Sequence, residues 1–223
     1  MHLTDSENLL PRLAAAAIFL LIGFPIHELA HGYMAYRQGD GTAKLFGRLT
    51  FDPRAHFDPQ GGMLLLVSTL LAGIPFGWAK PTPVNPGMMR DGRRGNALVA
   101  AAGPLSNLCM AVVAAIIIRI IPLDPYADKV SLFIAIVLET FLIINIALFI
   151  FNLIPVPPLD GYAVLINLLN PRSAWTVGQF LRQYGMYILL GLLILAFLPA
   201  MGANVPNPLG WLITHVYDFL VGI

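Results

Sequence analysis

Long apolar runs divide this chain, and four of them approach or exceed the length that crosses a bilayer. A helix needs about 20 apolar residues to cross the hydrocarbon of a membrane. The four runs cover residues 11–36, 96–121, 130–153 and 177–200. They predict an all-α integral membrane protein, built as a bundle of about 4–6 transmembrane helices.

Two shorter apolar stretches, residues 61–77 and 211–223, leave the number of crossings open. Basic residues precede and follow the first stretch, and basic flanks are expected on the cytoplasmic side of a membrane. A full crossing would separate those flanks, so a re-entrant element or a tilted hairpin is favoured. The second stretch is either a fifth span or a helix at the membrane interface.

Two polar stretches predict non-helical structure. Residues 42–52 alternate partly and are rich in Thr, Phe and Leu, which is typical of a short pair of strands. Residues 75–87 carry four prolines and cannot lie inside a helix. We expect both stretches to form a small membrane-associated β element beside the helices. No repeat or second domain is apparent, so residues 1–223 are expected to form one domain.

Composition supports the membrane assignment and excludes one class of partner. The chain is 57% hydrophobic and only 11% charged, whereas a soluble domain carries about 25% charged residues. Its net charge is +1. Nucleic-acid binding needs clustered Lys and Arg, so we expect no nucleic-acid partner.

The segment FPIHELAHGY contains candidate catalytic chemistry. His27 and His31 are four residues apart, so on a helix both can reach one metal ion. Glu28 lies beside the first histidine, where a carboxylate can take a proton from a water that zinc has made more acidic. Such residues are costly in an apolar helix unless they are functional. The alternative is a helix end at the interface, where they are simply solvated.

A catalytic zinc usually has a third protein ligand, and the sequence offers four candidates. They are Asp160, Glu139, His56 and His215. Asp160 is favoured because it follows three prolines that break a helix at membrane depth, which is tolerated where the backbone is buried in protein or lines a cavity. An ordinary Asp-Gly turn is the alternative explanation.

Three motifs together resemble the site-2 protease family of intramembrane zinc metallopeptidases. The chain has HELAH at residues 27–31, GPLSN at residues 103–107, and NLIP followed by LDG within residues 152–161. The resemblance covers roughly residues 12–168. It implies a zinc-dependent endopeptidase that cleaves transmembrane helices of membrane-protein substrates.

The resemblance also implies roles for individual residues. His27, His31 and Asp160 would hold Zn²⁺, and Glu28 would be the general base. Asn107 would be a polar group near the site that positions substrate or stabilises the oxyanion. A hydrogen bond between helices explains Asn107 equally well on physical grounds.

Two further residues are candidates for contact with substrate. Asn152 is expected to line a polar cleft, and His56 would bind substrate or tune the site, although a loop histidine more often has neither role. Residues 77–86 resemble the extended element that the family places beside its active site. The family often carries a PDZ or nucleotide-sensing domain. We expect neither here, so any regulator should be a separate protein.

Charge predicts the orientation in the membrane. Arg37, Lys44, Arg48 and Arg54 follow the first apolar run, whereas residues 122–128 contain two acids and no bases. The positive-inside rule therefore places the metal-bearing end of the first helix on the cytoplasmic side. We expect a multi-pass protein of a prokaryotic cell membrane.

Two other functions fit parts of the pattern. Broken helices and intramembrane carboxylates also build transport sites, so a membrane metal-binding protein or transporter without hydrolysis is the main alternative. Glu28 argues against it, because a metal carrier needs no general base. The complete ligand set argues against an inactive scaffold of the same fold.

Overall fold

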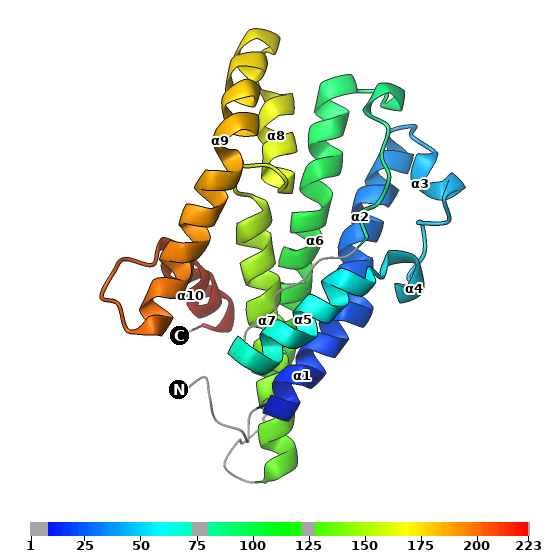
Figure 1. Cartoon of the computed structure of the whole chain (residues 1–223). Helices are drawn as coiled ribbons and strands as arrows, with labels where there is room; N and C mark the ends of the chain where they lie inside the picture. The colour runs from blue at the N-terminus through cyan, green and yellow to red at the C-terminus, as the bar shows by residue number, and fades with distance from the viewer. Residues whose placement is uncertain (1–8, 73–79, 122–127, 223) are drawn as a thin grey trace.

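The computed structural model describes residues 9–72, 80–121 and 128–222, and these residues form helices, turns and irregular segments. Four helical stretches are long and apolar enough to cross a membrane (Figure 1). They are Leu9–Arg37, α6 (Gly92–Ile120), α7 (Lys129–Asn152) and α9 (Pro171–Phe197). The prediction of a helical protein suited to the membrane is therefore confirmed.

The first long stretch is one continuous helical path with an irregular turn in its middle. It consists of α1 (Leu9–Ile18), a π-helical turn η2 (Phe19–Gly23) and α2 (Phe24–Arg37). The backbone N–H of Phe24 donates to the carbonyl of Phe19, five residues back. Pro25, next in the chain, has no N–H to donate. Such π turns are frequent at functional sites, and this one immediately precedes the turn that carries HELAH.

Small side chains let the central helices approach closely. Helix α6 packs against α2, α7 and α8 (Asp160–Leu168), and Figure 1 shows it beside α7 in the centre of the bundle. Ala111, Ala114 and Ala115 of α6 are buried against Leu142 and Ile146 of α7. Close packing of small against large residues is the usual basis of helix association in membranes.

The chain breaks after α7 and resumes as the short helix α8 (Asp160–Leu168). The prolines between the two helices cannot donate backbone hydrogen bonds, so α7 cannot continue through them. A Cβ at Gly161 would lie 2.3 Å from the carbonyl oxygen of Leu153. Only glycine therefore allows α8 to start against the end of α7, and the predicted break is confirmed.

The predicted strand pair at residues 42–52 is wrong. The first four residues form a helical turn, α3 (Thr42–Leu45), and no strand occurs among the residues that the structure describes. The fully buried Asp40 carboxylate accepts hydrogen bonds from the first residue of α3, which stabilises a turn. Gly47 then has φ +67°, a left-handed conformation that interrupts a ladder. A further short helix follows, α4 (Pro53–His56).

The two short apolar stretches form short helices among the described residues. Helices α5 (Pro59–Ala72) and α10 (Pro208–Val221) have 14 residues each. That length spans about 21 Å, against about 30 Å of hydrocarbon. Helix α5 lies beside α1, and α10 packs against α7 and α6. Residues 73–77 lie outside the described part of the chain, so a re-entrant path for this stretch stays a prediction.

Two 3₁₀ turns complete the described elements. One is η3 (Pro86–Met88), which precedes α6, and the other is η4 (Leu198–Met201), which follows α9. In Figure 1, α9 and α10 lie on the opposite side of α6 and α7 from α2.

Candidate metal centre and active site

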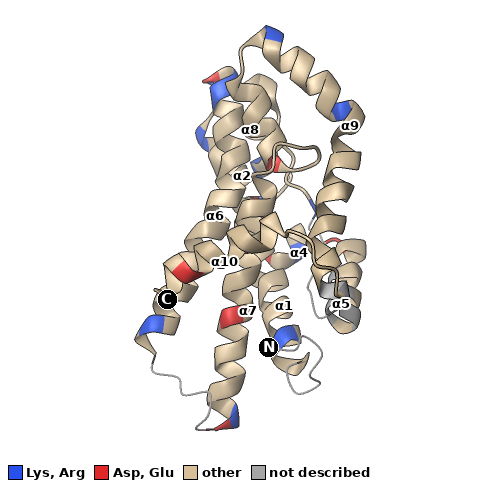
Figure 2. Cartoon of the chain, turned by 90° about the vertical axis from the view of Figure 1, so that its left-hand side faces the viewer, with Lys and Arg blue, Asp and Glu red and all other residues tan. Residues whose placement is uncertain are grey.

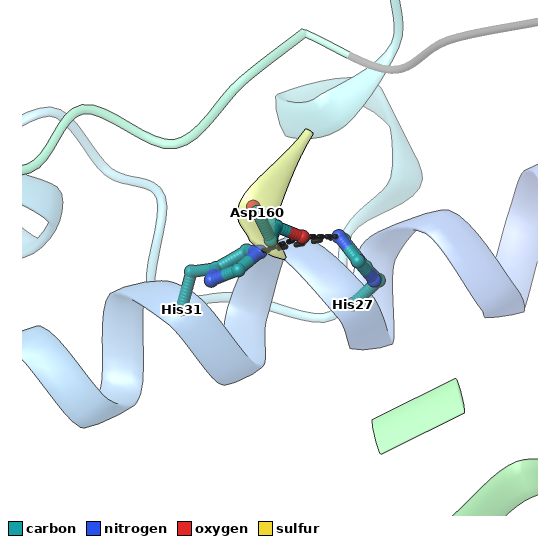
Figure 3. Close-up of side chains that lie close together, drawn as sticks. All are labelled: His27, His31 and Asp160. Atoms are coloured by element: carbon teal, nitrogen blue, oxygen red, sulfur yellow. Dashed lines mark hydrogen bonds and ion pairs between the residues drawn. The ribbon is translucent and has the colours of Figure 1, made fainter. Parts of the chain in front are cut away.

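Two helices bring the three favoured ligands together. His27 and His31 project from one face of α2, and Asp160 is the first residue of α8 (Figure 3). The two Nε2 atoms are 3.1 Å apart, and Oδ2 of Asp160 lies 3.5 Å and 3.4 Å from them. Ligand atoms at about 2.0–2.1 Å from a tetrahedral zinc are about 3.3 Å apart. The three donors therefore have the mutual spacing that such a site requires.

Hydrogen bonding also suits these atoms to a cation. Nδ1 of His31 lies 2.8 Å from the carbonyl oxygen of Val99, which can only accept, so Nδ1 carries the proton and Nε2 a lone pair. Nδ1 of His27 lies 2.6 Å from Oδ1 of Asn107. The Nε2 lone pairs and the Asp160 carboxylate then converge without a donor between them. Zinc bound by imidazole and carboxylate, with the outer ring nitrogen hydrogen-bonded, fits this donor set.

Gly103 makes room for the histidines. A Cβ at this position of α6 would lie 2.2 Å from Nε2 of His31 and 2.7 Å from Cε1 of His27. Any side chain there would push the ligand rings away from α6. The GPLSN motif therefore has a steric explanation in its glycine, independent of any contact with substrate.

Glu28 is held by the proline-rich segment. Its Oε2 accepts a hydrogen bond of 2.7 Å from the backbone N–H of Thr82, and Thr82 Oγ1 donates to the Glu28 carbonyl at 3.0 Å. Pro81 and Pro83 flank this amide and have no N–H of their own. Residues 80–85 form no helix and lie beside Glu28, as the resemblance implies; residues 77–79 lie outside the described part.

Asp40 anchors the same segment and was not singled out from the sequence. Its buried carboxylate accepts from the backbone N–H of Asn85 at 2.6 Å and from both the amide and the hydroxyl of Thr42. Burial raises the pKa of Asp40, but these hydrogen bonds outweigh burial and hold the pKa below its usual value. Asp40 is therefore ionised at neutral pH and fixes the segment that orients Glu28. In the sequence it is an ordinary Asp-Gly turn signal.

A cavity of about 770 Å³ opens beside the candidate ligands. His27, Glu28, His31, Asp160 and Asn152 line its polar part. Apolar residues of α7, α9 and α10 line much of the remainder, among them Ile143, Ala147, Leu189, Leu193, Leu209 and Ile213. Asn96, near the start of α6, also lines the cavity, and no motif in the sequence pointed to it. The cavity therefore has two parts: polar groups that can hydrolyse a peptide bond, and apolar walls beside them.

The other candidates lie elsewhere. His56 is 1% exposed and its Nε2 donates to the Thr50 carbonyl, which gives it a structural contact away from the ligand cluster. Glu139 accepts a hydrogen bond from Tyr217, and His215 packs against Trp211. Of the four candidates for a third ligand, only Asp160 joins the histidines.

Asn107 lies behind His27, away from the cavity. It is fully buried and does not line the cavity, and its amide contacts His27 on one side and Asn145 on the other. This placement favours the hydrogen bond between helices over direct contact with substrate.

Comparison with known proteins gives a consistent assignment. Residues 118–196 match the description "Peptidase family M50". The chain is 39% identical over 193 residues to YwhC of Bacillus subtilis, covering 84% of this chain and 82% of YwhC. It is 30% identical over 214 residues to Rip2 of Mycobacterium tuberculosis, covering 92% of this chain and 74% of Rip2. Both relatives are named zinc metalloproteases. No solved structure matches the chain.

The family match contains the segment of Asp160, and the alignments with the two relatives extend over most of the chain. Together with the helices suited to the membrane, these similarities show that the chain belongs to peptidase family M50, the site-2 protease family, and is a metalloprotease.

Proposed function

We propose that this metalloprotease cleaves transmembrane helices of other proteins inside the bilayer. The main support for this proposal is the position of the site far from the end of a helix suited to span the membrane. His27 is ten residues before the end of α2 at Arg37, which is about 15 Å along the helix. The cavity at that depth is lined mostly by apolar side chains of neighbouring helices. A substrate suited to such walls is itself apolar, as a membrane helix is.

The residues of the site would divide the work as follows. His27, His31 and Asp160 would hold Zn²⁺, which supplies a Lewis acid that polarises a carbonyl and makes a water more acidic. Glu28 would take a proton from the attacking water and return it to the leaving amine. The Thr82 amide on Oε2 orients this carboxylate and leaves Oε1 for proton transfer.

The substrate must unwind before it can be cut. In a helix, each peptide carbonyl is engaged in the backbone ladder and is shielded from attack. An extended segment freed of that ladder exposes polar backbone groups, which need partners in a membrane. Asn152 and Asn96 offer such partners at the cavity wall. Helix-breaking residues near the cut should therefore speed cleavage.

Reconstitution tests this proposal. We expect zinc-loaded protein in liposomes to cut a single-span substrate within its apolar segment, faster when a glycine or proline lies near the cut, and to stop when a chelator removes the metal. The readout is product mass, which locates the cut. Zinc-loaded protein that leaves a panel of membrane helices intact, with and without helix breakers, would support a metal carrier or transporter instead.

We also propose that the site faces the cytoplasm of a prokaryotic cell. Arg37 ends α2, Arg93 and Arg94 begin α6, and Arg172 begins α9. Arg93 donates to backbone carbonyls at the end of α8, and the backbone N–H of Arg90 donates to the Gln38 carbonyl just after α2, so these helix ends lie together. Figure 2 shows several Lys and Arg segments at this end of the bundle and fewer at the opposite end. The positive-inside rule assigns such an end to the cytoplasm.

Cysteine labelling of intact cells tests the orientation. The background is Cys109→Ser, because the natural cysteine is exposed. We expect Lys44→Cys, on α3, to react with a membrane-impermeant maleimide only after lysis. We expect Lys129→Cys, at the start of α7, to react in intact cells. The reverse pattern would invert the proposed topology.

A further inference from the structure

We propose that Asn145 is a positioning residue that sets the tautomer of His27, acting through Asn107. The inference rests on the proposed zinc site and adds a residue that none of the three sequence motifs contains. Asn145 lies on α7, the helix that supplies none of the metal ligands. It reaches the site only through a chain of hydrogen bonds.

Three hydrogen bonds make the chain. Nδ2 of Asn145 donates to the Phe141 carbonyl at 2.9 Å, and Nδ2 of Asn107 donates to Oδ1 of Asn145 at 3.0 Å. Oδ1 of Asn107 then lies 2.6 Å from Nδ1 of His27. Both asparagines are 0% exposed. The chain therefore runs from the backbone of α7 through α6 to the first histidine of α2.

The far end of the chain fixes its direction. A backbone carbonyl can only accept, so the amino group of Asn145 must face Phe141 and its oxygen must face Asn107. Asn107 must in turn give its amino group to Asn145 and its oxygen to His27. That oxygen also can only accept, so Nδ1 of His27 carries the proton. Nε2 is left with a lone pair, directed at His31 and Asp160.

Packing alone does not account for an asparagine here. The neighbouring buried residues of α7, Leu142 and Ile146, are apolar and pack against alanines of α6. A leucine at position 145 would suit that surface. A buried amide is costly unless its groups are paired, and here they are paired in an order that serves His27.

The main test measures zinc affinity of detergent-purified protein by competition with a chelator. Loss of an outer partner of a ligating histidine typically costs about 10–100-fold in metal affinity. We expect a loss of this size in Asn145→Leu, because Asn107 can then rotate its amide and donate to His27. The double variant Asn107→Asp/Asn145→Leu should regain most of the affinity, because a carboxylate at position 107 only accepts and holds the proton on Nδ1.

A matched control separates this role from packing. Ile146 is equally buried on α7 and lies in the apolar cluster with α6. Ile146→Ala should lower thermal stability and leave zinc affinity within about 2-fold, because Ile146 takes no part in the hydrogen bonds that lead from Phe141 to His27. Wild-type affinity in Asn145→Leu, or no recovery in the folded double variant, would overturn the inference.

A second measurement applies even if Asn145→Leu does not fold. Nitrogen-15 spectra of histidine-labelled, zinc-free wild-type protein should show His27 protonated at Nδ1. A His27 ring without a proton on Nδ1 would overturn the inference. If wild-type protein binds no zinc while His27 shows the expected tautomer, the proposed function is contradicted. The hydrogen bonds from Asn145 through Asn107 to His27 would then still be supported.

Discussion

Asp160→Ala is expected to purify without stoichiometric zinc. The carboxylate completes a three-ligand set with His27 and His31, and its Oδ2 lies within 3.5 Å of both Nε2 atoms. Two imidazoles alone make an incomplete site. The affinity should therefore fall by more than the roughly 10–100-fold that loss of an outer partner costs. Metal analysis of purified protein, followed by chelator competition, measures the loss.

Two histidine variants serve as controls for this ligand assignment. His215 is exposed and packs on Trp211, so His215→Ala should keep the full metal content. His56 is buried, so His56→Ala should reduce stability but keep zinc in the folded fraction. Full zinc in Asp160→Ala together with loss in His56→Ala would reassign the third ligand.

The chemistry in HELAH could be predicted because it is local. The four-residue spacing of His27 and His31 places both rings on one face of any helix, whatever surrounds it. The prolines before Asp160 likewise break the helix whatever the tertiary context. Asp160 itself was one of four candidates from the residues alone. The prolines favoured it over Glu139, His56 and His215, and the approach of Asp160 to His27 and His31 supports that choice.

The prediction of a strand pair was wrong because turn-forming residues outweigh the strand-forming composition of this segment. Residues 42–52 have strand-forming side chains, but the Asp40 carboxylate fixes a turn at their start and Gly47 adopts a positive φ within them. A membrane-associated element of two strands also needs a regular ladder to satisfy its backbone. Here the Arg48 guanidinium bonds the Ala55 carbonyl and closes the loop on itself.

The supporting residues could not be predicted because their partners are far apart in sequence. Thr82 is hydrogen-bonded to Glu28, 54 residues away in sequence, and Asn107 to His27, 80 residues away. No periodicity or spacing encodes such pairs. The motif did mark Asn107, but the role of the residue follows from its burial between α2 and α7. Asn145 belongs to none of the three motifs, and its role is inferred only from its contact with Asn107.

Glu28→Gln is expected to lose peptide-bond cleavage while keeping zinc. Glutamine is nearly isosteric, and its amide oxygen can still accept the Thr82 N–H that now bonds Oε2. The proline-rich segment should therefore stay in place. Glu28 is not one of the three candidate ligands, so His27, His31 and Asp160 should hold the metal as before. The variant removes only the group that takes a proton from water and returns it to the leaving amine.

The expected loss in turnover is about 100–10,000-fold, the usual contribution of general acid–base catalysis. The assay is cleavage of a membrane-helix substrate in liposomes, with metal content measured on the same preparation. Glu139→Gln is the matched control, because it makes the same chemical change on α7 at a carboxylate bonded to Tyr217 and absent from the cavity wall. Its turnover should stay near that of the wild type. Near-normal turnover by Glu28→Gln with full zinc would remove this residue as the proton carrier, because the only feature lost is its negative charge.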